Sequence, residues 1–564
     1  ERYQGVKDLL LDLRNLQHRL DFETELQRSK PTETDRLNVP SHSDNLPAAS
    51  AVPSANQGAP PITPAADSPV SRRTRHTRMA AIAVLSLVIA SAGFAYFYFA
   101  SPAAAIDSIA VLPFANTSND PNTEYLSDGI SETLINSLTQ LRQLRVIART
   151  TAFRYKGKEI DPRQVGRELN VRAVMTGRVR EMGDTLHIQV DLVDAMTGGQ
   201  LWGQEYESKL SEALSVKRAI AREASQKLRL KLSGEDERRL LRRDTTNAEA
   251  YRFYLRGRYY AAKRTADGLK KAMLEFQQAI DRDPNYALGY VGLADSNGLL
   301  EEYAGVPAGE TLLKARAAAD RALQIDDSLS EAHTSSAFIF WQMWRWPEAE
   351  EEFRRAINLN PNYETAHHWF SIHFRMKGQF DDSLREIKRA QELDPLSAVI
   401  GQNVAEVYLL KNDTTSASEE CRKIIELDPD FPGAHDELGF AYLKQRRYEE
   451  AVAEFQKTVE LSGNASRYQG DLGYGYAVTG RRADALALVK ELERKYARHE
   501  AIGQYLAQVY AGLGDGDRTF AWLEKDFAQH SGSRLSFVKW WFTFDNLRSD
   551  PRYADLVRRM GLEP

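Results

Sequence analysis

The sequence predicts a multidomain protein that combines a single transmembrane helix, an α/β domain and a long all-α array of helical repeats. Three observations lead to this prediction. Residues 79–100 form an uncharged apolar run, and residues 107–232 alternate strand-like with helix-like patterns. From residue 247 onward, small and aromatic residues recur with a fixed period, as expected for a repeat protein.

The composition is that of a folded protein and excludes several classes. The chain has 564 residues, of which 42% are hydrophobic and 27% charged, and this length allows about three or four domains. Its 74 Lys and Arg residues nearly balance 79 Asp and Glu residues, so the net charge of -5 provides no chain-wide field for nucleic acid. The single cysteine, Cys421, excludes an internal disulfide and a multi-thiolate metal site.

Residues 1–28 are predicted to form an amphipathic helix, because their apolar positions recur at steps of three and four. These positions are Val6, Leu9, Leu13, Leu16 and Leu20. The helix either packs on a further domain or forms a short coiled coil ahead of the membrane segment. Residues 29–78 are rich in Pro, Ser and Ala and are predicted to be a disordered linker with a basic, Arg-rich end.

Residues 79–100 are predicted to cross a membrane as one helix. They carry no charge and reach about 33 Å as a helix, which matches the hydrocarbon layer of a bilayer. Four arginines precede the run between residues 72 and 78, and no Lys or Arg follows until Arg142. The positive-inside rule therefore places the amino end in the cytoplasm and the later domains on the other side.

Residues 107–232 are predicted to form the α/β domain. Its expected strands cover residues 108–114, 144–148, 171–180, 185–193 and 201–206, and its expected helices cover residues 124–141, 165–169 and 210–232. The domain has no Walker-type loop, no GxGxxG after a strand and no paired histidine motif. Nothing in its sequence therefore requires catalysis.

Residues 247–530 are predicted to hold about seven helical repeats. Pro361, Pro395 and Pro429 recur every 34 residues and would end the second helix of each unit. Small residues recur at one position of the unit: Ala349, Ser383, Ala417, Ala451 and Ala485. This spacing resembles the tetratricopeptide repeat (TPR), and residues 531–564 are expected to cap the stack.

The resemblance to TPR proteins implies a superhelix whose concave groove binds a protein or peptide. By repeat position, the residues predicted to face this groove are Trp341, His368, Arg375, Gln402, Glu406, Asp436 and Lys444. The alternative is that each is an ordinary solvated surface residue. His367, His368 and His373 lack the spacing that places two consecutive imidazoles on one helix face, so no metal site is predicted. Cys421 is expected to be a buried packing residue rather than a nucleophile.

Residues 108–206 resemble the TolB-like domain of bacterial multidomain signalling proteins. Six blocks carry the resemblance: 109–114 (IAVLPF), 124–130 (EYLSDGI), 144–149 (LRVIAR), 165–171 (VGRELNV), 176–180 (TGRVR) and 197–202 (TGGQLW). The resemblance implies an interaction or ligand-sensing domain with no established catalytic residues. Relatives that continue into TPR units often carry a protein kinase or a winged-helix domain at the other end.

The first residues favour the kinase. The segments Glu1-Arg2-Tyr3-Gln4, Leu9-Leu10 and Asp12-Leu13-Arg14 resemble the last helix of a bacterial serine/threonine protein kinase. The resemblance implies that Arg2 pairs with a glutamate of the kinase activation segment. It also implies that ATP and Mg²⁺ are needed only by a kinase domain missing from this chain, which itself has no predicted catalytic residue and no cofactor.

The leading hypothesis is therefore the sensory and interaction region of a receptor-like kinase in the bacterial inner membrane. The carboxyl-terminal domains would lie in the periplasm or outside the cell, and ligand binding or homodimerisation would act on the kinase. A membrane-anchored TPR assembly scaffold and a transmembrane transcription regulator stay open as alternatives. So do the identity of the ligand and whether the chain itself occupies its groove.

Overall fold

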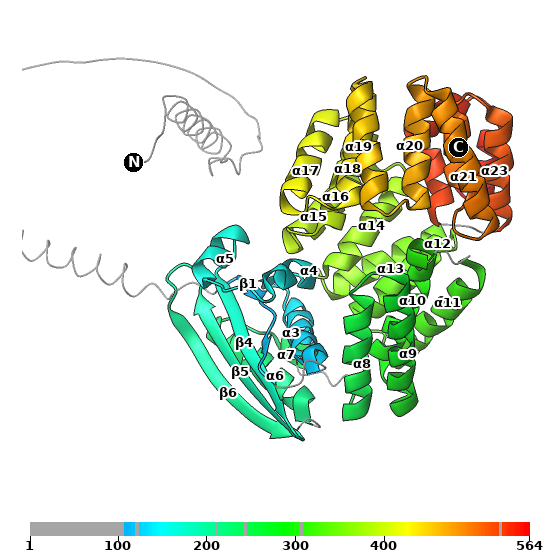
Figure 1. The fold of residues 1–564 in the computed structure, drawn as a ribbon. Helices are drawn as coiled ribbons and strands as arrows, with labels where there is room; N and C mark the ends of the chain where they lie inside the picture. The colour runs from blue at the N-terminus through cyan, green and yellow to red at the C-terminus, as the bar shows by residue number, and fades with distance from the viewer. Residues whose placement is uncertain are drawn as a thin grey trace, which may run out of the picture. The chain divides into compact units, whose positions relative to one another are not determined.

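The computed structural model describes residues 106–118, 123–209, 212–240, 245–304, 308–529 and 533–563. These residues form a sheet-containing module and a helical array, and both belong to one compact unit (Figure 1). The expected amino-terminal helix at residues 1–28 and the linker at residues 29–78 lie outside the described residues.

The predicted fold class needs correction. Within the described ranges, no helix is both long enough and apolar enough to cross a bilayer, and the segment predicted to do so, residues 79–100, lies outside them. The described chain is instead a mainly helical array of TPR-like pairs with one small sheet region. The helices of the array are amphipathic and bury their apolar side against one another, which explains why none has the uniformly apolar surface of a membrane span.

The module contains a mixed sheet in the order β3-β1-β4-β5-β6, with β2 paired to β4. Strand β1 runs parallel to β3 and β4, whereas β4, β5 and β6 form an antiparallel meander. The strands are β1 (Ser108–Val111), β2 (Ala115–Asn116), β3 (Arg145–Val146), β4 (Ala173–Met182), β5 (Thr185–Asp194) and β6 (Gln200–Lys209). The α/β pattern read from residues 107–232 is thus present, with strands at each expected place.

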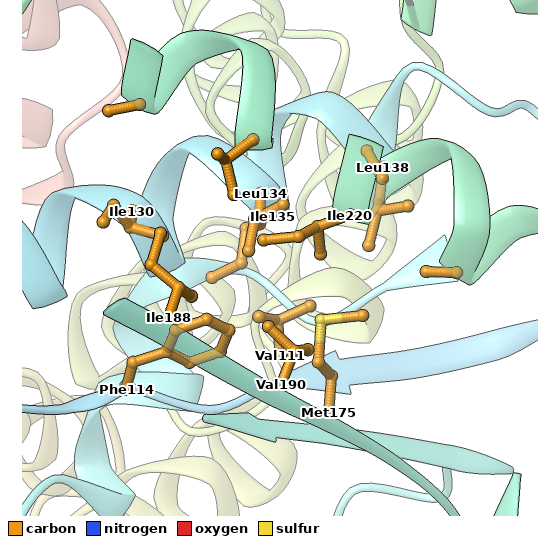
Figure 2. Packing of buried hydrophobic residues seen from close by; sticks show 14 of the residues in the cluster. Val111, Phe114, Ile130, Leu134, Ile135, Leu138, Met175, Ile188, Val190 and Ile220 are labelled. Atoms are coloured by element: carbon orange, nitrogen blue, oxygen red, sulfur yellow. The ribbon is translucent and has the colours of Figure 1, made fainter. Parts of the chain in front are cut away.

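Alternation along the strands separates two apolar layers. Ile109 and Val111 of β1 face the larger core beneath α3 and α6, which Figure 2 shows around Leu134, Leu138 and Ile220. Ala110 and Leu112 face the opposite layer, which α5 covers. The module helices are α3 (Glu124–Thr139), α4 (Arg149–Ala152), α5 (Pro162–Glu168), α6 (Ala213–Lys227) and α7 (Gly234–Leu240), with the 3₁₀ turn η2 (Phe153–Tyr155) after α4.

The array contains eight antiparallel helix pairs in the described residues, where the sequence predicted about seven. The pairs are α8 (Ala248–Ala261) with α9 (Ala266–Arg282), α10 (Ala287–Ala304) with α11 (Ala308–Ile325), α12 (Ser330–Gln342) with α13 (Trp346–Leu359), α14 (Glu364–Met376) with α15 (Phe380–Leu393), α16 (Ala398–Leu410) with α17 (Thr414–Leu427), α18 (Pro432–Lys444) with α19 (Tyr448–Leu461), α20 (Ser466–Val478) with α21 (Arg482–Ala497), and α22 (Gly503–Gly512) with α23 (Gly516–Ala528).

Small residues let the paired helices approach closely. All five predicted small positions, from Ala349 to Ala485, are fully buried, and the larger residue four places later fills the space beside each. The approach is also close where α18 meets α19, since a Cβ atom added to Gly439 would lie 2.7 Å from the ring of Phe455. The repeat register read from the sequence is therefore confirmed.

A histidine clamp recurs in three of the pairs. In the first of them, His333 contacts Glu352 through Nδ1 at 2.6 Å and the carbonyl oxygen of Asp327 through Nε2 at 2.8 Å. His367 and His435 make the corresponding contacts to Glu386 and Glu454 and to the carbonyl oxygens of Pro361 and Pro429. Each clamp ties the start of a first helix to the second helix of its own pair, so His367 has a structural partner in a carboxylate.

The carboxyl-terminal segment comprises η4 (Ser533–Lys539), η5 (Phe542–Leu547) and α24 (Pro551–Arg559). It packs on the last helix pair and also reaches back to the middle of the array. The indole N–H of Trp540 donates to the carbonyl oxygen of Met376 at 2.8 Å, and that of Trp346 donates to the carbonyl oxygen of Met560 at 2.9 Å. The segment therefore covers several repeats rather than the end of the stack alone.

Ala451→Trp should destabilise the array by about 3 kcal/mol or more, because an indole cannot fit at a fully buried helix contact. Urea denaturation followed by circular dichroism measures the change. Leu427→Trp is the matched control, since Leu427 is an exposed residue at the end of α17. An Ala451→Trp transition that coincides with that of the control would contradict the assigned register.

Candidate functional site

The candidate site is a cavity of about 1090 Å³. Its wall draws mainly on the first helices of the pairs, α10, α12, α14 and α16, and on the segments that lead into α20 and α22. This agrees with the expectation that first helices line the concave side of a TPR superhelix. The module contributes Arg149, Phe153 and Arg154, and the carboxyl-terminal segment contributes Phe537.

Five of the seven predicted groove residues meet at this cavity: Trp341, His368, Arg375, Gln402 and Glu406. The other two lie elsewhere in the fold. Asp436 is buried beside Arg467 at 3.8 Å, and the ammonium group of Lys444 lies 4.6 Å from the ring centre of Phe542. Whether any of the seven contacts a partner stays a prediction.

An aromatic stack forms one side of the wall. Phe338 lies between Trp341 and Trp369, with ring centres 5.8 Å and 4.2 Å away. Trp341 is only 5% exposed, yet its indole N–H has no acceptor in the structure. A buried donor without an acceptor costs free energy, so this group is well placed to receive one from a ligand.

Arg375 is the most deeply buried cation of the wall, at 1% exposure. One end of its guanidinium pairs with Glu406, and Nη2 donates to the side-chain oxygen of Asn403 at 2.6 Å. Its Nε–H has no acceptor. The aromatic ring of Phe537 lies below the group at 5.6 Å, so the carboxyl-terminal segment helps to hold it in place.

His368 is held neutral at this site. Burial, reinforced by the positive charges of Arg375 and Arg264, lowers the pKa of His368 to about 3. Its Nε2 is buried without a partner. The uncharged ring can therefore either accept or donate one hydrogen bond in the cavity.

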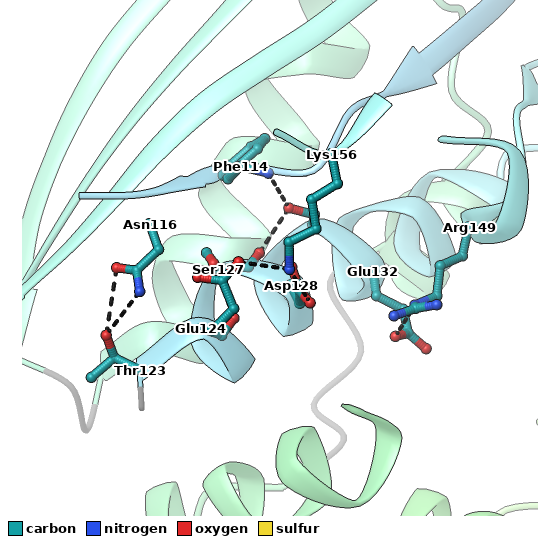
Figure 3. A network of polar contacts seen from close by, with 10 residues as sticks. Phe114, Asn116, Thr123, Glu124, Ser127, Asp128, Glu132, Arg149 and Lys156 are labelled. Carbon is teal, nitrogen blue, oxygen red and sulfur yellow. Dashed lines mark hydrogen bonds and ion pairs between the residues drawn. The ribbon is translucent and has the colours of Figure 1, made fainter. Parts of the chain in front are cut away.

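The module reaches the cavity through a shared carboxylate. Glu132 of α3 accepts from Nε of Arg149 and from Nε of Arg258, each at 2.7 Å (Figure 3 shows the contact with Arg149). Burial alone would raise the pKa of Glu132, but the positive charges of Arg258 and Arg149 outweigh it and lower that pKa below its ordinary value. One acidic group of the module thus holds one cation from α4 and one from α8.

Hydrogen bonds from the loops between repeats to backbone groups of residues 141–151 hold the module against the array. The side-chain amide of Asn362 donates to the carbonyl oxygens of Leu141 and Leu144, both at 3.1 Å. Asp394 accepts from the backbone N–H of Thr151 at 2.8 Å. These loops follow the helices that the repeat residues Pro361 and Pro395 end, so the module docks on a periodic feature of the array.

Two acidic groups in the wall have raised pKa values. Burial raises the pKa of Asp295 to about 6, against a hydrogen bond from Ser335 that lowers it. Burial, with the negative charge of Asp394, raises the pKa of Glu364 to about 7. Both groups carry less negative charge near neutral pH than ordinary carboxyl groups, so the cations dominate the wall.

Sequence reasoning missed the parts of the wall that lie outside the central repeats. These are Arg149 and Arg154 of the module, Arg258 and Arg264 near α8, Arg467, Lys495 and His499 near α20 to α22, and Phe537. Groove positions counted within one repeat carry no information on which distant repeats meet. A basic residue in a loop gives no sequence pattern of its own.

The comparisons with known proteins agree with the repeat architecture. A family model described as tetratricopeptide repeat matches residues 432–465, which hold α18 and α19. The array is thus built of TPR units. A model described as the second domain of HilA/YgeH-like transcriptional regulators matches residues 104–222, which hold the sheet of the module. That description differs from the TolB-like family that the sequence blocks resemble.

A curated relative covers part of the chain. A protein of Rhizobium meliloti (strain 1021) named "Putative adenylate cyclase 3" is 34% identical over 245 residues, which is 43% of this chain and 42% of the relative. The chain therefore spans about two fifths of that relative's length.

Three solved structures are similar to parts of this chain. The protein PilF of Pseudomonas aeruginosa is 20% identical, with a TM-score of 0.30 over 37% of this chain and 94% of that chain. YrrB, described as a TPR protein with an unusual peptide-binding site, is 20% identical, with a TM-score of 0.26 over 34% and 93%. Human IFIT1 with PPP-AAAA is 15% identical, with a TM-score of 0.37 over 57% and 79%.

Glu364→Gln should change how stability depends on pH. The folded-state pKa of Glu364 is about 7 against an ordinary 4.5, so its contribution is present below about pH 4.5 and is lost as the pH rises through 7. The variant should match the wild type near pH 4.5 and exceed its unfolding free energy at pH 8 by about 3 kcal/mol. Urea denaturation at both pH values measures this, with the exposed Glu419→Gln as control. Parallel pH profiles of wild type and Glu364→Gln would contradict the assignment.

Proposed function

We propose that this chain is an interaction module that binds a protein or peptide partner at the mouth of the cavity. The observation that carries the proposal is the meeting of five predicted groove residues in one wall formed by first helices of TPR units. Arrays of such units present their concave side to partner proteins. The sheet module, which resembles TolB-like domains in sequence, adds to the same wall and shares in ligand sensing in this proposal.

The mouth offers a surface suited to a partner. Val399 at the start of α16 lines the cavity and is 43% exposed, so its apolar side chain is open to a partner. Asn403 lies one turn further along the same helix. A partner seated here would bury Val399 and hydrogen bond to groups at the rim.

A photoreactive phenylalanine analogue in place of Val399 should give a discrete cross-linked product in cells of the source organism. The analogue in place of Leu274 should not, although Leu274 is 69% exposed, because it lies on α9, a second helix. Gel mobility and mass spectrometry identify the product. Equal labelling at the two positions, or none at Val399, would refute a partner at the mouth.

We further infer that this interaction region, comprising the sheet module and the helical array, regulates a nucleotide-using signalling enzyme on the same polypeptide. Support comes from the resemblance of residues 1–20 to the last helix of a serine/threonine kinase. The curated relative, with its cyclase name, favours a second candidate output, cyclic nucleotide synthesis. An assembly scaffold without any catalytic output is the alternative from another class.

The purified full-length parent should transfer labelled phosphate from ATP to itself or to a protein substrate. The same reaction is analysed for cyclic AMP, whose formation would replace the kinase proposal by the cyclase. Absence of both products, with Mg²⁺ present, would leave the scaffold as the function.

A further inference from the structure

We propose that the deep part of the cavity binds a compact organic anion of metabolite size that carries a carboxylate or a phosphate group. This goes beyond partner binding at the mouth, because it concerns the buried wall and a different class of ligand.

The unpaired polar atoms of the wall are nitrogens. Among the described cavity residues, buried side-chain atoms without a hydrogen-bond partner include the indole N–H of Trp341, Nε of Arg375 and Nε of Arg467. Nε2 of His368 is a further nitrogen of this kind, and among the described side chains that line the cavity no oxygen belongs to the set. Three obligate donors and one group able to donate require a ligand rich in acceptors.

The charge of the wall favours a negative ligand. Arg149 and Arg258 share the single carboxylate of Glu132, so this cluster keeps an excess of positive charge. Arg264 and Lys495 add further cations. Of the acids that line the cavity, Glu406 pairs with Arg375 and Glu500 pairs with Arg498. Burial raises the pKa of the other three, Asp295, Glu364 and Asp394, and makes them harder to ionise. An anion would gain charge-assisted hydrogen bonds from these donors.

The walls favour a compact ligand over an extended chain. The volume of about 1090 Å³ lies just above the usual range of small-molecule sites, which ends at about 1,000 Å³. Phe153 and Arg154 of the module stand at one side, and Phe537 of the carboxyl-terminal segment stands at another. A bound anion would thus be enclosed by residues of the module, the array and the carboxyl-terminal segment.

The test titrates the purified chain with three anions, namely pyrophosphate, citrate and adenosine monophosphate, and with two neutral compounds, adenosine and glycerol. Tryptophan fluorescence reports binding, since Trp341 and Trp369 lie in the wall. At least one anion should bind more than tenfold tighter than its neutral counterpart, and the comparison of citrate with the two phosphates identifies the preferred group. If no anion binds more tightly than adenosine and glycerol, the proposal is wrong.

Trp341→Phe is the decisive variant. It removes only the unpaired N–H and keeps an aromatic ring in the stack, so the melting temperature of the free protein should not change. Affinity for the anion should fall about tenfold, the loss expected for one hydrogen bond to a charged group. Trp540→Phe is the matched control, because its N–H is used by the carbonyl oxygen of Met376. That variant should melt earlier and bind the anion as the wild type does.

A second pair of variants tests charge. Arg264→Gln removes a cation from the wall and should weaken anion binding several-fold, whereas Arg482→Gln removes an exposed cation from α21 and should not. Equal affinity of wild type, Trp341→Phe and Arg264→Gln would overturn the proposal even if an anion binds. The titration contains no partner protein. A failed titration would therefore overturn the anion site, whereas a failed cross-link at Val399 would overturn partner binding at the mouth of the cavity.

Discussion

The close contact between the two helices of each pair is the constraint on which the rest of the structure depends. A small residue at one position of five consecutive units, from Ala349 to Ala485, lets the backbones approach, and the residue four places later fills the remaining space. Repeating one contact geometry produces a regular superhelix. Only because the superhelix is regular do residues from α8, α14 and the segment before α20 come to share one wall.

The periodic contact also explains what the sequence predicted well. Prolines, small residues and aromatics at fixed spacing determine the register of the helix pairs, and alternation in residues 185–193 determines the inward face of β5. Five groove residues followed from register alone, because a position within the repeat determines its side of the superhelix. Asp436 and Lys444 share such positions, yet local partners, Arg467 and the Phe542 ring, occupy them.

The remaining features depend on contacts between segments far apart in the chain, and the repeat pattern does not predict such contacts. Asn362 and Asp394 belong to inter-repeat loops, where polar residues are ordinarily solvated. Here both are buried because the module supplies carbonyl and N–H groups that match them. Likewise, the carboxyl-terminal aromatics predicted to cap the stack reach back to Met376 and Phe440, a path set by complementary surfaces and not by spacing.

The composite wall gives the cavity a means of acting on the whole chain. A ligand shifts a conformational equilibrium only by its difference in affinity between two states. A ligand that touches Arg149 of the module, Arg375 of the array and the Phe537 side of the carboxyl-terminal segment favours the state in which all three are docked, since an undocked state lacks part of the wall. Docking would in turn increase affinity by the same factor, because the coupling is reciprocal. The cluster of Arg149, Glu132 and Arg258 lies across the junction of module and array, so undocking of the module would separate Arg258 from its carboxylate partner.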